Sequence, residues 1–168
     1  MNKRTGVVIP LAALYTKDCE AVGDFMALKP FADFCQSCGF SVIQLLPVND
    51  TGTQSSPYSG LSAFALHPLY IRLESLPEFE LALNGDKSFA AAYKNYIKGN
   101  KYKKRFDYDK LTQEKYKLLH LIYSYAEKLA EGKKTPAKSG VNVVNAGEGS
   151  SFGTKFKAEL DSFVQENS

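Results

Sequence analysis

The residues of this sequence that are best suited to bind a ligand lie in the polar loop between Val48 and Gly60. Its side chains are neutral hydrogen-bonding groups, one carboxylate and one aromatic ring: Asn49, Asp50, Thr51, Gln54, Ser55, Ser56, Tyr58 and Ser59. A sugar needs this combination, because its hydroxyl groups require many donors and acceptors while the C–H face of a pyranose packs on an aromatic ring. The loop therefore has the chemistry of a carbohydrate-binding loop.

The same composition also fits an ordinary capped turn. In that interpretation Pro57 fixes one φ angle, and the Asn, Asp and Ser side chains bond to backbone groups of the turn itself. Composition alone favours this second interpretation, so the position of the loop in the fold has to be considered as well.

The elements predicted around the loop place it where ligands usually bind. Apolar runs at 6–11 and 40–48 predict two strands of a parallel sheet, the second covered on both faces. Between them, apolar residues spaced by three and four over 22–38 predict an amphipathic helix that stops at Gly39. Pro30 allows this helix to begin near Leu28. In such a βαβ unit the functional loops follow the carboxyl ends of the strands, and the polar loop leaves the second strand at that end.

Two cysteines form a C-x-x-C pair, Cys35 and Cys38, at the end of the predicted helix. A helix C-terminus disfavours a thiolate, so we predict two small core residues rather than a redox site. A zinc site would need further ligands, and the remaining candidates Cys19, His67 and His120 lack a suitable spacing. We therefore predict no metal site.

The basic and aromatic stretch at 98–110 is the only segment that suggests nucleic acid. Asp107 and Asp109 dilute its charge, which favours a solvated turn between helices. No Gly-rich phosphate loop follows the first strand, and we predict no cofactor.

The composition is that of an ordinary globular domain, with 168 residues, 44% of them hydrophobic and 23% charged. The net charge of +3 implies no strong field for nucleic acid or an anionic membrane. The N-terminus lacks a small-residue cleavage site, and no apolar run is long enough for a membrane helix. Together with three sparse cysteines, these features favour a cytoplasmic protein.

The chain is predicted to divide into four segments. The βαβ unit and its loop occupy 1–75, and helical patterns with many charges occupy 76–131. A region rich in Gly, Ser, Lys and Asn predicts a flexible linker over 132–153, and 154–168 is the start of a further helix.

Several stretches, taken in order, resemble a known family. VGDF at 22–25, QLLPVND at 44–50 and SPYSGLSAFALHPLYI at 56–71 resemble the N-terminal part of the 4-alpha-glucanotransferases, glycoside hydrolase family 77. RTGVVIPLAAL at 4–14 is similar to the first strand of that family. The chain departs from the family pattern at Ile43, where many members have Trp, and at His67, where many amylomaltases have Asn.

The resemblance implies an α/β fold that is the N-terminal part of a (β/α)8 TIM barrel, incomplete in this chain and interrupted by the helical segment as an insertion. It implies an enzyme that transfers α-1,4-glucan segments between maltooligosaccharides or glycogen-like acceptors by a retaining double displacement. The catalytic carboxylates of the family lie on later strands, so we expect none in this chain and expect the isolated fragment to be inactive.

The resemblance also assigns roles within the loop. It implies that Tyr58 stacks on sugar, that Ser56 hydrogen-bonds to it, and that Asp50 orients the loop or touches a hydroxyl group. The alternative is a non-catalytic carbohydrate-binding module or an inactive remnant, and the oligomeric state stays open. In either case the second strand is expected to be poorly buried, through Val42, Ile43, Leu45 and Leu46.

Overall fold

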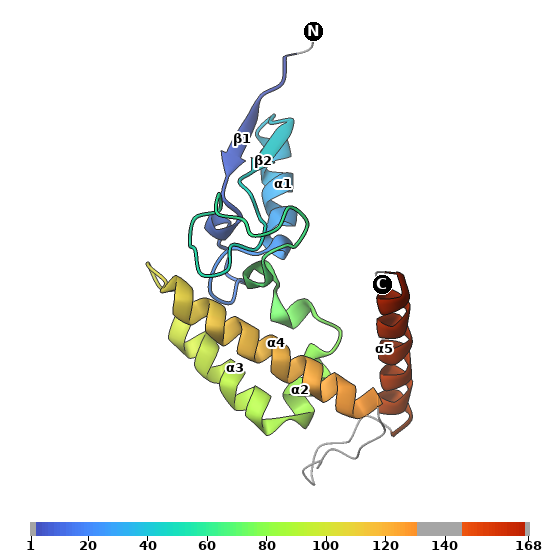
Figure 1. Cartoon of the computed structure of the whole chain (residues 1–168). Helices are drawn as coiled ribbons and strands as arrows, with labels where there is room; N and C mark the ends of the chain where they lie inside the picture. Colours follow the sequence, from blue (N-terminus) through green and yellow to red (C-terminus); the bar gives the residue numbers. More distant parts are fainter. Residues whose placement is uncertain (1–2, 131–145, 167–168) are drawn as a thin grey trace. The chain divides into compact units, whose positions relative to one another are not determined.

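The computed structural model describes residues 3–130 and 146–166. It divides into two compact units, one formed by Met1–Ser75 with Asn95–Tyr116 and the other by Leu76–Lys94 with Lys117–Ser168. Two helices, α3 (Lys87–Asn100) and α4 (Tyr108–Ala130), contribute residues to both units. Figure 1 shows the elements coloured along the chain.

The first unit begins with the predicted strand, helix and strand. β1 (Gly6–Ile9) pairs in parallel with β2 (Val42–Leu45), and α1 (Leu28–Ser37) connects them (Figure 1). The predicted parallel pairing is thus confirmed. Both strands are shorter than predicted, because Pro10 and Pro47 follow them closely and have no N–H group for the ladder.

Local signals set the bounds of α1. The helix begins at Leu28, as expected from Pro30 in its first turn, and a single 3-10 turn at Phe25–Ala27 precedes it. The Asp24 side chain caps that turn by accepting a hydrogen bond from the backbone N–H of Ala27 at 2.9 Å. Gly39 ends the segment with a φ of +80°, a backbone conformation that glycine adopts easily.

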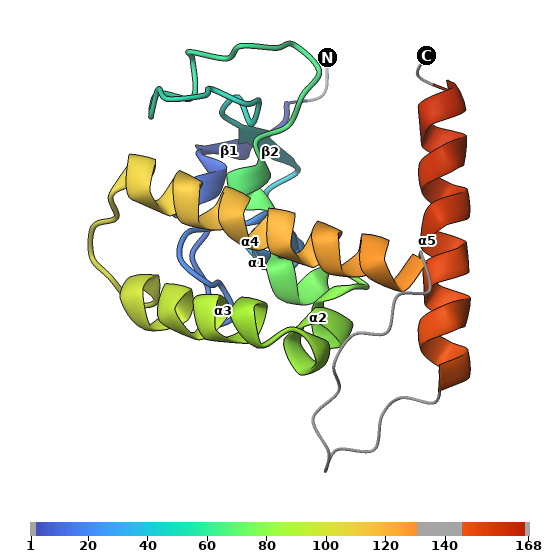
Figure 2. The same cartoon turned by 60° about the horizontal axis from the view of Figure 1, so that its bottom comes forward.

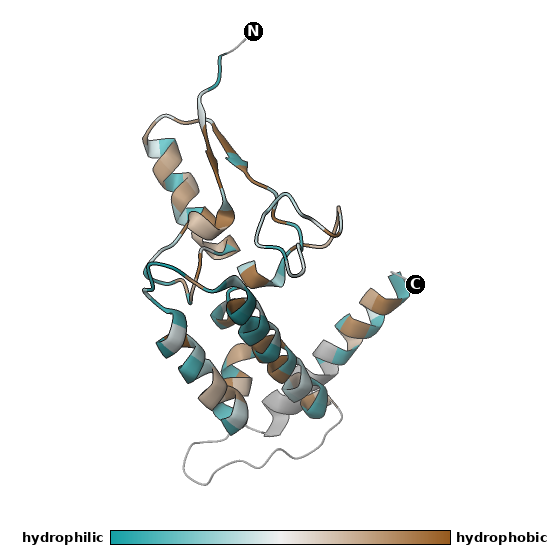
Figure 3. Ribbon diagram, turned by 60° about the vertical axis from the view of Figure 1, so that its left-hand side comes forward, coloured by the Kyte–Doolittle hydropathy of each residue, from teal (hydrophilic) through white to brown (hydrophobic). Residues whose placement is uncertain are grey.

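The two strands are hydrophobic along most of their length (Figure 3), yet none of their side chains is buried. Val42 is 40% exposed, and Ile43, Leu45 and Leu46 are half-buried. The expected poor burial of the second strand is confirmed. Coverage of that strand on both faces was wrong for this chain, because the residues of β2 alternate between exposed and half-buried.

The core of the first unit lies beyond the carboxyl ends of the strands. Its buried members are Leu11, Leu14, Cys19 and Ala27, and the partly buried side chains packed against them are Ile9, Phe25, Leu28, Phe31, Val48 and Tyr70. Two 3-10 turns, Pro68–Tyr70 and Leu73–Ser75, follow the polar loop, and no strand forms in this apolar stretch. The core is therefore built next to both ends of the loop.

The second unit contains α2 (Phe79–Gly85) and parts of α3 and α4, which run antiparallel to each other (Figure 2). The helical pattern over 79–99 is divided into two helices at Asp86, whose Oδ1 accepts hydrogen bonds from the backbone N–H groups of Ser88 and Phe89. Phe79 and Tyr93 pack with ring centroids 4.9 Å apart in the core of this unit.

The last described element is α5 (Ala146–Glu166). Its first eight residues, 146–153, were predicted to be the end of the linker over 132–153. The rest of that predicted linker lies outside the described residues. The division of the chain into the four predicted segments remains a prediction.

Candidate functional site

The polar loop after β2 folds back on itself. The backbone N–H of His67 donates to Val48 O at 2.9 Å, and the N–H of Asp50 donates to Ala65 O at 2.9 Å. One antiparallel bridge joins Asn49 to Leu66. These bonds close the loop at its base, so its position is set by the core residues on either side.

Tyr108, the first residue of α4, holds the base of the loop from another part of the sequence. Its hydroxyl oxygen lies 2.7 Å from His67 Nε2, 2.9 Å from Thr51 Oγ1 and 3.0 Å from the carbonyl oxygen of Gly52. Thr51 and His67 are both buried, at 4% and 2% exposure. The Tyr108 hydroxyl group therefore connects Thr51 and Gly52, at the start of the loop, to His67, which follows its end.

The hydrogen bonds define the protonation state of His67. Its Nδ1 accepts a hydrogen bond from the backbone N–H of Leu69 at 3.1 Å, so the proton of the neutral ring is on Nε2 and points to Tyr108. Burial lowers the pKa of His67, while the nearby Asp50 carboxylate raises it to a smaller extent. The ring is thus kept neutral. We call the bonds that join Tyr108 to His67, Thr51 and Gly52 the loop anchor.

Asp50 is half-buried near the start of the loop. Its Oδ1 accepts from the backbone N–H of Gly52 at 2.9 Å, which supports the positive φ of +57° at that glycine. Its Oδ2 lies 3.3 Å from the hydroxyl group of Tyr116 on α4. Both carboxylate oxygens of Asp50 are therefore hydrogen-bonded, one within the loop and one to α4.

The outer part of the loop is exposed and surrounds an open depression of about 330 Å³, lined by Pro47, Asn49, Pro57, Tyr58, Gly60, Leu61, Ser62 and Ala63. Tyr58 is 73% exposed there. The Ser56 hydroxyl accepts a hydrogen bond from the Tyr58 N–H at 3.4 Å, which is the local bond of a turn. The structure brings Ser56 and Tyr58 together, but Asp50 and Ser56 are not among the lining residues.

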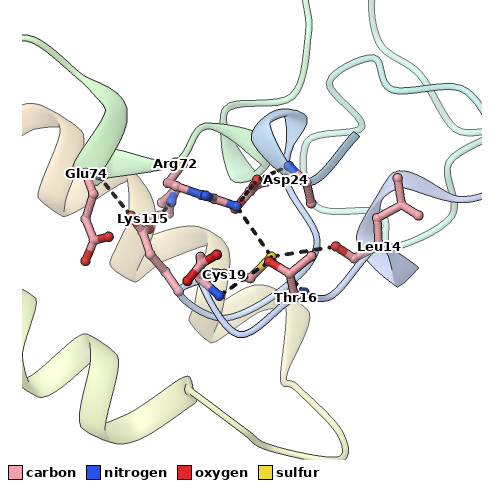
Figure 4. Close-up of polar contacts among 10 residues, drawn as sticks. Leu14, Thr16, Cys19, Asp24, Arg72, Glu74 and Lys115 are labelled. Atoms are coloured by element: carbon pink, nitrogen blue, oxygen red, sulfur yellow. Dashed lines mark hydrogen bonds and ion pairs between the residues drawn. The ribbon is translucent and has the colours of Figure 1, made fainter. Parts of the chain in front are cut away.

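The same unit contains a buried cluster of charged side chains (Figure 4). Arg72 donates from Nε and Nη2 to the two carboxylate oxygens of Asp24, at 2.9 and 2.8 Å. Lys115 Nζ lies 2.7 Å from Glu20 Oε2, and both side chains are less than 5% exposed. Burial lowers the pKa of Lys115, whereas the Glu20 carboxylate raises it.

The other sequence candidates have different environments. Cys35 is buried, as predicted. Cys38, the C-cap of α1, is exposed, so its prediction as a core residue was wrong. The stretch 98–110, predicted as a turn between helices, is a turn at 101–107 only, and its two ends belong to α3 and α4. In the described part of the chain, no group of three His, Cys, Asp or Glu side chains could hold a metal ion.

Comparison with known proteins decides the family. The model of the 4-alpha-glucanotransferase family, glycoside hydrolase family 77, matches residues 9–145. This chain belongs to the 4-alpha-glucanotransferase family. The predicted family resemblance, which came from the loop and its flanking strands, is confirmed.

Members of the 4-alpha-glucanotransferase family from different kingdoms are similar to this chain. A 4-alpha-glucanotransferase of Chlamydia trachomatis is 49% identical over 76 residues, which cover 45% of this chain and 14% of the relative. A rice relative, from Oryza sativa subsp. japonica, is 42% identical over 86 residues, or 48% of this chain and 9% of its own length. The chain thus spans about one-seventh of the length of the chlamydial relative and 9% of the length of the rice relative. No solved structure matches it.

Sequence reasoning on the 4-alpha-glucanotransferase motifs missed Tyr108 and Tyr116, which lie on a helix where the resemblance is weak. It considered His67 as a candidate metal ligand and as a departure from the family pattern, whereas the structure makes this residue part of the loop anchor. None of the helices in the described residues is long and apolar enough to cross a membrane.

Proposed function

We propose that this chain is part of a 4-alpha-glucanotransferase that moves α-1,4-glucan segments between maltooligosaccharides or glycogen-like acceptors by a retaining double displacement. In this proposal β1, α1 and β2 form the first unit of a (β/α)8 barrel, and the polar loop lies on its ligand-binding side. The observation that carries the proposal is the exposed Tyr58 ring beside the open depression, at the carboxyl end of β2, in a chain of this family.

The roles proposed for the loop residues come from the family resemblance, and the geometry of the loop supports them. Tyr58 presents an exposed ring on which a pyranose can stack. Ser56 is exposed next to it and offers a hydroxyl group to a sugar. Asp50 contributes by holding Gly52 and so the shape of the loop, and its carboxylate can also accept from a sugar hydroxyl group.

Replacing Tyr58 by alanine is expected to weaken the binding of maltoheptaose to the chain by about tenfold, because the stacking surface is lost. Isothermal titration of the purified chain measures this. Phe64→Ala is the matched control, since Phe64 is 93% exposed in the same loop but does not line the depression. Equal losses in both variants would show that the effect comes from general exposed apolar surface and would contradict the stacking role.

The 168-residue chain alone is expected to release no glucose from maltotriose. Retaining transfer needs two carboxyl groups about 5 Å apart across the scissile bond. The polar loop contains one acid, Asp50, so it supplies at most one of these two groups. Glucose and longer oligomers above a blank would contradict this expectation, while binding without transfer would fit a carbohydrate-binding module equally well.

A further inference from the structure

Tyr116 combines two properties that distinguish it from Tyr108, the tyrosine of the loop anchor. Its hydroxyl group bonds to Asp50 Oδ2 at 3.3 Å, yet its side chain is 44% exposed. It lies eight residues after Tyr108 on α4, a little over two turns along the helix and about 80° around it. Tyr108 is used for the anchor, whereas the ring of Tyr116 stays accessible beside the loop.

The Asp50 carboxylate next to this ring has unused capacity. Each carboxylate oxygen can accept about two hydrogen bonds, and among the described residues Oδ1 accepts one, from Gly52, and Oδ2 one, from Tyr116. Asp50 is only half-buried, so a hydroxyl group can reach it. An exposed aromatic ring next to a carboxylate with free lone pairs matches the apolar face and the hydroxyl edge of a pyranose.

The alternative is that Tyr116 serves only to hold Asp50. A bond at 3.3 Å between a partly exposed hydroxyl and a carboxylate is long and contributes little to stability. The Gly52 N–H already orients Asp50 through a shorter bond of 2.9 Å. A purely structural role for Tyr116 would therefore rest on the longer of the two bonds that hold Asp50.

We propose that Tyr116 is a further glucan-binding residue, which stacks on one pyranose of an α-1,4-glucan while Asp50 accepts a hydrogen bond from a hydroxyl group of the same sugar. The inference rests on the proposed function of the loop and adds a residue from α4 to it. It makes Tyr58 and Tyr116 two separate stacking positions, one from the loop and one from the helix.

Maltoheptaose titrations of the full chain test this with three variants at the helix. Tyr116→Ala is expected to weaken binding about 3- to 10-fold, and Tyr116→Phe, which keeps the ring, by less than about twofold. Tyr123→Ala is the matched control, because Tyr123 lies on the same helix with a similar exposure of 42%, and it is expected to bind like the unchanged chain. Thermal unfolding of each variant checks that the fold is intact.

A second measurement separates sugar contact from a structural role. In spectra of the chain with ring-labelled tyrosine, the signal that disappears in Tyr116→Phe identifies the Tyr116 ring, and it is expected to shift as maltoheptaose is added. Unchanged affinity in Tyr116→Ala, or a ring signal that does not move when the sugar binds, would overturn the inference and leave the role of Tyr58 intact. Loss in Tyr116→Ala but not in Tyr58→Ala would support it and refute the role of Tyr58. No binding to the unchanged chain would refute both.

Discussion

Replacing Lys115 by alanine is expected to lower the free energy of unfolding by about 3–5 kcal/mol, the range for breaking a buried ion pair. Lys115 is buried on α4 with its Nζ 2.7 Å from Glu20 Oε2, and Glu20 is equally buried. The variant leaves the Glu20 carboxylate without its counter-ion in an environment that water hardly reaches. Urea unfolding at neutral pH, followed by circular dichroism, measures the loss.

Two controls show whether the unpaired charge causes this loss. Lys110→Ala removes a lysine from the same helix whose pair with Glu114 is long, at 3.9 Å, and largely exposed, so it should cost less than about 1 kcal/mol. The double variant Glu20→Gln with Lys115→Met removes both charges and keeps an acceptor for the Glu74 N–H. It should recover more than half of the loss, and a double variant no more stable than Lys115→Ala would contradict the electrostatic explanation.

Local patterns were sufficient to predict the first unit up to the loop. Pro30 and Gly39 mark the ends of α1 because their backbone preferences do not depend on distant residues. The parallel pairing followed from two apolar runs separated by a helix. The strand lengths were overestimated, because an apolar run does not show at which residues the ladder of hydrogen bonds begins and ends.

The anchor of the loop could not be predicted, because its contacts join residues that are far apart in the sequence. Tyr108 reaches His67 across 41 positions and Gly52 across 56. Nothing in the local sequence around Tyr108 distinguishes it from a tyrosine at the start of any exposed helix. The chemistry of the loop was readable from its composition, while the groups that fix its shape required the tertiary structure.

The buried charges were missed for a different reason. Lys and Glu are rarely fully buried unless they are paired, so a prediction from sequence places them at the surface. Glu20 and Lys115 are 95 positions apart, and each lies in a stretch with other charged residues. Only the ion pair that they form in the tertiary structure shows that these two side chains lie in the interior.

Replacing His67 by alanine is expected to lower the free energy of unfolding by about 2–4 kcal/mol near pH 8, through a cavity and two lost hydrogen bonds. The imidazole ring is only 2% exposed. Without it the backbone N–H of Leu69 loses its acceptor and the hydroxyl group of Tyr108 loses a donor. His67→Asn should lose less, because the Asn side-chain oxygen can still accept from Leu69.

The cost of His67→Ala is also expected to depend on pH. Because burial lowers the pKa of His67 in the folded state below its ordinary value of 6.5, the unfolded chain binds the proton more readily. The stabilisation by His67 is therefore complete above about pH 6.5 and is lost progressively as the pH falls below that value. The alanine variant lacks this group, so its difference from the unchanged chain should shrink between about pH 8 and pH 5.

Urea unfolding at several pH values measures that difference, with His120→Gln as the control for the second, exposed histidine. The control variant should keep the pH dependence of the unchanged chain. A protonated His67 would place an N–H group on Nδ1 opposite the N–H of Leu69, so the loop anchor itself should loosen in acid. A difference between the chain and His67→Ala that stays constant over the whole range would mean that His67 is not held neutral by its burial.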